Sequence, residues 1–177
     1  MSKARSVPAV LNVADLLALA YRIEVDAVER YVLLADQMET HNNPELTKVF
    51  RDLARAERIH AEEIRRLADD TDLARRADAL RSTWQKTESP EEVDLAAAHY
   101  LMTPWHALQL TLAAEKRALA FFTSIVETTK NAKVKEIAAE LVEEEAEHVN
   151  LVYRLLNKYP KPEDSWSQDG DPPAAQD

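Results

Sequence analysis

Residues 53–67 read LARAERIHAEEIRRL and residues 141–155 read LVEEEAEHVNLVYRL, and these two stretches decide the fold. Each contains a Glu-x-x-His motif, which begins at Glu57 in the first stretch and at Glu145 in the second. The surrounding apolar residues recur every three or four positions, which is typical of an amphipathic α-helix with one buried face. Because positions i and i+3 share a helix face, each motif directs a carboxylate and an imidazole toward the protein interior.

The same periodicity predicts four long helices, at about 12–40, 44–69, 104–130 and 132–159. At the first break Asn43 places a capping side chain directly before Pro44, and the last helix follows after the region of Asn131. The segment 70–102 is less regular and is expected to be a long crossover, with a short helix that begins near Ser89 and ends near Tyr100. Glycine occurs only once and no segment alternates like a half-buried strand, so the fold class is all-α.

The first and third long helices each place one glutamate on the apolar stripe. These residues are Glu24, with Tyr31 seven positions later, and Glu115, with Phe122 seven positions later. At about 1.5 Å of rise per residue, each glutamate and its Glu-x-x-His partner lie roughly 20 to 25 Å from the turn that joins their helices. Four carboxylates are therefore expected to meet in one layer at mid-bundle.

Such a layer predicts a metal site. Buried carboxylates without counter-charge would cost several kcal/mol each, whereas two divalent cations balance four carboxylates. Carboxylates with two imidazoles suit Fe(II) or Mn(II) and also accept Zn(II) or Co(II). The predicted ligands are Glu24, Glu57, His60, Glu115, Glu145 and His148.

The pattern resembles the ferritin-like superfamily and, within it, the erythrin domain of the rubrerythrin family, over roughly residues 12–158. The resemblance implies a four-helix bundle of two antiparallel pairs, a di-iron centre and a homodimer. It also implies reduction of hydrogen peroxide or dioxygen, with Glu24 and Glu115 as terminal ligands, Glu57 and Glu145 as bridges, and one histidine per iron. Two features depart from the family pattern: the chain has no cysteine for a rubredoxin module, and Ala118 stands where many members carry a further glutamate.

Composition limits the other classes of function. Asp and Glu total 32 against 22 Lys and Arg, and this charge of −10 works against binding nucleic acid or anionic membranes. The absence of cysteine excludes disulfides, thiolate nucleophiles and iron–sulfur clusters. Residues 1–11 are expected to be an extension without signal-peptide features, 12–159 the bundle, and 160–177 an acidic tail. A cytoplasmic location is expected.

Several interpretations remain open at this stage. The site could oxidise Fe(II) instead of reducing peroxide, with electrons supplied in the latter case by an external protein. The chain could also bind or deliver iron without turnover, or form a structural bundle without metal. Tyr31 is expected mainly to pack in the core, with a possible contact to a site carboxylate or a role in electron transfer. Surface or capping roles are expected for the remaining histidines, and solvated positions for the acids off the stripes: His41, His99, His106, Glu29, Glu62, Glu63, Glu143, Glu144 and Glu147.

Overall fold

The computed structural model describes residues 12–68, 72–84 and 102–162, and this part of the chain contains five α-helices. Their bounds are α1 Val13–Thr40, α2 Pro44–Ala68, α3 Leu73–Trp84, α4 Pro104–Thr128 and α5 Ala132–Leu156. The four long helices agree with the sequence prediction to within a few residues at each end. The all-α fold is therefore confirmed. None of the helices described here is both long and apolar enough to cross a membrane.

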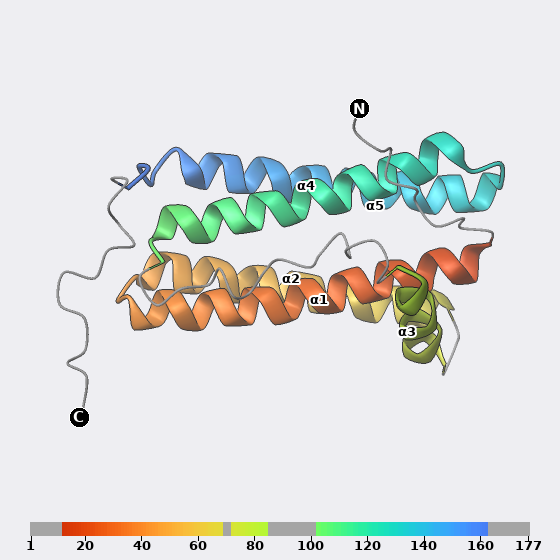
Figure 1. Ribbon diagram of the computed structural model, residues 1–177, viewed down its shortest axis with the longest axis horizontal. Helices are drawn as coiled ribbons and strands as arrows, with labels where there is room; N and C mark the ends of the chain where they lie inside the picture. Colours follow the sequence, from red (N-terminus) through yellow and green to blue (C-terminus); the bar gives the residue numbers. More distant parts are fainter. Residues whose placement is uncertain (1–11, 69–71, 85–101, 163–177) are drawn as a thin grey trace, which may run out of the picture.

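The four long helices form two antiparallel pairs that face each other (Figure 1). Close backbone approaches are concentrated within the pairs, between α1 and α2 and between α4 and α5, and few occur from one pair to the other. Side chains therefore fill the wider space between the pairs. This space is where functional groups from all four helices can meet.

Asparagine side chains set the starts of three helices. Asn12 accepts a hydrogen bond from the Asp15 amide at 2.9 Å, and Asn131 accepts from the amides of Lys133 and Val134. In the α1–α2 turn, Asn43 accepts from the Leu46 amide at 3.0 Å, directly before Pro44. The capping that the sequence predicts at Asn43 is therefore confirmed, the cap at Asn131 is added by the structure, and the turns fix the register within each pair.

Helix α3 differs from the expected irregular crossover. Leu73 and Ala77 are fully buried against the first half of α1, and Arg76 pairs with Asp15 at 3.2 Å. Leu80 extends the same spacing of three and four residues, which is why this short segment is helical. The short helix expected between Ser89 and Tyr100 lies outside the described residues.

Two apolar clusters fill the bundle and leave a polar layer between them. In α1 the first cluster reaches Ile23 and the second begins at Ala27. In α5 the first cluster ends at Leu141 and the second begins at Val149. The inward residues between these limits occupy the middle of the bundle, with apolar side chains on both sides. Leu67 continues the apolar spacing of α2 three residues after the buried Ile64, but it is 69% exposed because it lies at the very end of that helix.

Candidate metal centre

The polar layer contains the four glutamates that the sequence placed on the apolar stripes. Glu24, Glu57, Glu115 and Glu145 are between 2% and 5% exposed. Each comes from a different long helix, and each falls in the gap between the two apolar clusters. Burial of four carboxylates in one layer requires partners of positive charge or protons, because desolvation strongly disfavours their charged forms.

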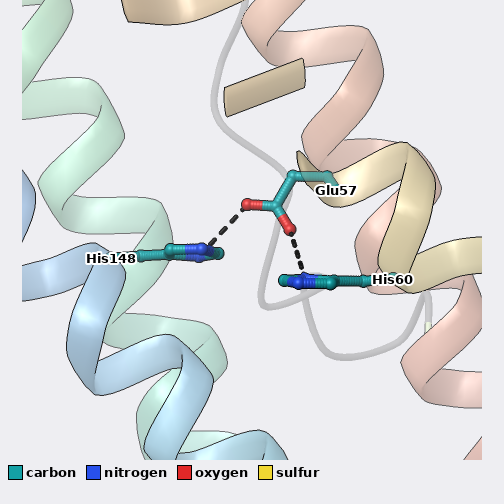
Figure 2. A group of neighbouring side chains, drawn as sticks. All are labelled: Glu57, His60 and His148. Atoms are coloured by element: carbon teal, nitrogen blue, oxygen red, sulfur yellow. Dashed lines mark ion pairs between the residues drawn. The ribbon is translucent and has the colours of Figure 1, made fainter. Parts of the chain in front are cut away.

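Glu57 lies between two imidazole rings, as Figure 2 shows. Its Oε2 is 3.2 Å from Nδ1 of His60 on the same helix, and its Oε1 is 3.1 Å from Nδ1 of His148 on α5. The two rings are nearly parallel, with centroids 6.0 Å apart. Each carboxylate oxygen of Glu57 therefore faces a different histidine.

The two contacts between Glu57 and the imidazoles are as short as hydrogen bonds, but their atoms are not aligned for hydrogen bonding. Among the described residues, Nδ1 of His60, Nδ1 of His148 and Oε1 of Glu57 have no aligned hydrogen-bond partner although all three atoms are buried. Buried polar atoms in folded proteins are nearly always hydrogen-bonded. Donor atoms that lie close together but are not aligned for hydrogen bonding have the arrangement expected of ligands that share an ion.

Glu115 has a different environment. Its Oε1 accepts hydrogen bonds from the hydroxyl of Tyr31 and, at 3.2 Å, from Nη2 of Arg30. Its Oε2 lies 3.4 Å from Nδ1 of His148. Both donors come from α1, and both side chains are buried. A fixed positive charge therefore lies against one of the four site carboxylates.

The protonation states of the layer follow from these contacts. Burial, followed by the charge of Glu57, raises the pKa of Glu24 well above its ordinary value. Burial also opposes charge on Glu57 and Glu115, but the neighbouring imidazoles, and Arg30 for Glu115, lower the pKa of both carboxyls. Burial likewise opposes charge on His148, but Glu115 and Glu57 raise its pKa to about 9. Without metal, a proton on His148 neutralises part of the layer, and the raised pKa of Glu24 favours the neutral form of that carboxyl.

Within the described part of the chain, two sets of donors could each hold a metal ion. One set is Glu57, His60 and His148, and the other is Glu115, Glu145 and His148, with the ligand atoms of each set within 4.8 Å of one another. Three of the four glutamates and both histidines belong to a set. Glu24 lies outside both sets, although it interacts with Glu57 by charge and by a side-chain hydrogen bond. Oxygen and imidazole donors in this ratio fit Fe(II), Mn(II) or Zn(II).

Two site residues were not found from the sequence. Arg30 lies three positions after Ala27 and four before Leu34, on the buried face of α1, and this spacing is the signal in the sequence that points to it. Glu144 was expected to be solvated, but it is half-buried. Burial raises its pKa, and its carboxylate interacts with the charges of His60 and His148.

The remaining histidines and Tyr31 largely follow expectation. Nδ1 of His106 lies 2.8 Å from Oγ1 of Thr103 at the start of α4, which is a capping role, and His41 is exposed. His99 lies outside the described residues. Tyr31 packs against Phe50 in the core and also hydrogen-bonds a site carboxylate, so both of its expected structural roles occur together.

Comparison with known proteins identifies a matching family and a similar solved structure. Residues 15–156 match the Rubrerythrin family. Among solved structures, the chain is similar to an uncharacterized conserved protein from Magnetospirillum magnetotacticum MS-1. The two are 34% identical with a TM-score of 0.70, over 85% of this chain and 97% of that one. No curated protein matches the chain.

Proposed function

Because this chain belongs to the rubrerythrin family, we propose that its bundle holds two iron ions and reduces hydrogen peroxide or dioxygen with electrons from an external donor. The observation that carries the proposal is the position of Glu57, whose two oxygens each lie beside a different imidazole. A carboxylate in that position can bridge two ions. The proposed ligands are Glu24, Glu57, His60, Glu115, Glu145 and His148.

The protein's own residues position and insulate the reaction. When bound, two ferrous ions supply one electron each, and hydrogen peroxide takes up these two electrons with two protons to form two water molecules. Glu57 and Glu145 are proposed as bridging ligands, and His60 and His148 as one nitrogen ligand for each ion. The apolar clusters on both sides of the layer limit access of water, which strengthens every charge interaction inside it.

The proposed reaction takes its electrons from a donor outside these 177 residues. The sequence has no cysteine, so it cannot hold a rubredoxin-type iron centre that would pass electrons within the chain. The same observation favours a second candidate function, an iron-binding or iron-delivery protein without turnover. Ferroxidase activity, in which Fe(II) itself is the substrate, uses the same donor set.

Stopped-flow absorbance on anaerobic protein loaded with two Fe(II) separates these functions. A peroxidase oxidises both ions rapidly on addition of hydrogen peroxide and turns over when a reductant is supplied. A ferroxidase oxidises many added Fe(II) per chain with dioxygen. Slow oxidation by both hydrogen peroxide and dioxygen would overturn the enzyme proposal. Iron binding or delivery without turnover would then be the remaining function. Glu57→Gln should abolish rapid oxidation, whereas Glu63→Gln, an exposed change on the same helix, should not.

Other expectations from the family resemblance stay predictions. A homodimer is expected, and light scattering coupled to size-exclusion chromatography measures it directly. A cytoplasmic location is likewise a prediction. Metal identity and number require elemental analysis of protein produced without a metal-binding tag, combined with anomalous scattering from crystals.

A further inference from the structure

The two halves of the bundle share their ligand pattern but differ beside the single glutamates. Six and seven residues after Glu24, α1 carries Arg30 and Tyr31. Six and seven residues after Glu115, α4 carries Phe121 and Phe122. All four side chains are buried. Only the first pair can donate hydrogen bonds, so the local pseudo-symmetry of the site is broken at these two positions.

Arg30 and Tyr31 each donate a hydrogen bond to the same atom, Oε1 of Glu115. A carboxylate oxygen has two lone pairs in its plane. On Oε1 of Glu115, the Tyr31 hydroxyl and Nη2 of Arg30 occupy both of them. The free lone pairs are then those of Oε2, which faces His148. Glu115 can therefore offer one oxygen to an ion, whereas both oxygens of Glu57 face imidazoles.

The guanidinium adds a fixed positive charge to the same side of the layer. Arg30 is 4% exposed, so water screens its charge poorly. It reduces the formal charge of the four carboxylates from −4 to −3 before any proton is counted. A cation bound at Glu115 is repelled by this charge more strongly than a cation bound at the opposite side of the layer.

We infer that Arg30 is a positioning residue: with Tyr31 it restricts Glu115 to a single metal-binding oxygen and makes the ion position beside Glu115 the weaker of the two. The inference rests on the proposed metal site. It deepens the proposed function because an ion with fewer protein ligands has more room for an oxidant. Arg30 acts through Glu115 and does not itself touch the ion.

Titration of metal-free protein with Co(II), followed by visible absorption and calorimetry, tests the inference. Wild-type protein should bind two ions in two unequal steps. Arg30→Met should strengthen only the weaker step, by about tenfold or more, because it removes a nearby positive charge and frees a lone pair on Oε1. The Co(II) absorption of that step should weaken, since a second oxygen raises the coordination number.

Three further variants distinguish positioning from a general effect. Arg30→Lys keeps the charge and a donor and should restore the wild-type steps. Tyr31→Phe removes the other donor with little change in volume, and it should strengthen the same step by a smaller factor. Arg22→Met removes a charge from the same helix at a residue that pairs with Asp26, and it should change neither step. Circular dichroism verifies the fold of each variant.

Two results would overturn the inference. One is an Arg30→Met protein with wild-type affinities and Co(II) spectrum, and the other is an equal shift of both steps. Absence of the proposed metal site gives a different result, because wild-type protein would then bind no Co(II) at all, and loss of the redox activity alone is detected separately by the stopped-flow assay.

Discussion

Substitution of Glu57 by glutamine tests the central geometry of the site. The two oxygens of Glu57 face different imidazoles, and one of these, His148, also belongs to the donor set of Glu115 and Glu145, so the change should weaken binding of both ions while preserving side-chain volume. Each ion present at 100 times its Kd stabilises the folded state by about 2.7 kcal/mol, or about 5 kcal/mol for two ions. For a domain of this size, that corresponds to a rise in Tm of roughly 10–20 °C.

The assay is thermal unfolding followed by circular dichroism, with Mn(II) present and with a chelator. The quantity compared is the metal-dependent rise in Tm, because the substitution also changes the metal-free protein, where Glu57 lies beside two imidazoles. Glu57→Gln should lose most of this rise, and the exposed Glu63→Gln should keep all of it. A full metal-dependent rise in Glu57→Gln would refute the assignment of Glu57 as a shared ligand.

Three further outcomes are expected. Tyr31→Phe should lower the free energy of unfolding of the metal-free protein by about 1–2 kcal/mol in urea titrations, because Glu115 loses a buried hydrogen-bond donor. The Tm of the metal-free protein should fall as pH rises from 6.5 to 9. Burial opposes charge on His148, but Glu115 and Glu57 raise its pKa from 6.5 to about 9. The protonated imidazole therefore stabilises the folded state fully below pH 6.5, and this contribution is lost as the pH rises through about 9. His148→Gln should flatten this dependence. Phe50→Ala should cost about 3–5 kcal/mol in the core, whereas Val32→Ala at an exposed position should change stability by less than about 0.5 kcal/mol.

The sequence by itself determined the helices and the candidate ligands. The spacing of apolar residues, interrupted at Asn43 and Asn131, was sufficient because an amphipathic helix and its caps depend on residues close together in the chain. Equal distances from the turns then placed the four glutamates at one height, since the rise per residue is constant. Helix α3 was missed because its apolar pattern is short and depends on packing against α1.

Only the tertiary structure decided how the site carboxylates are partnered. Arg30 and Glu115 lie 85 positions apart in sequence, and no local pattern indicates that one donates to the other. The same holds for the position of Glu57 between His60 of its own helix and His148 of α5. The charge and hydrogen bonding of a buried group depend on whatever side chains other helices bring within a few ångströms, and that is set by three-dimensional packing.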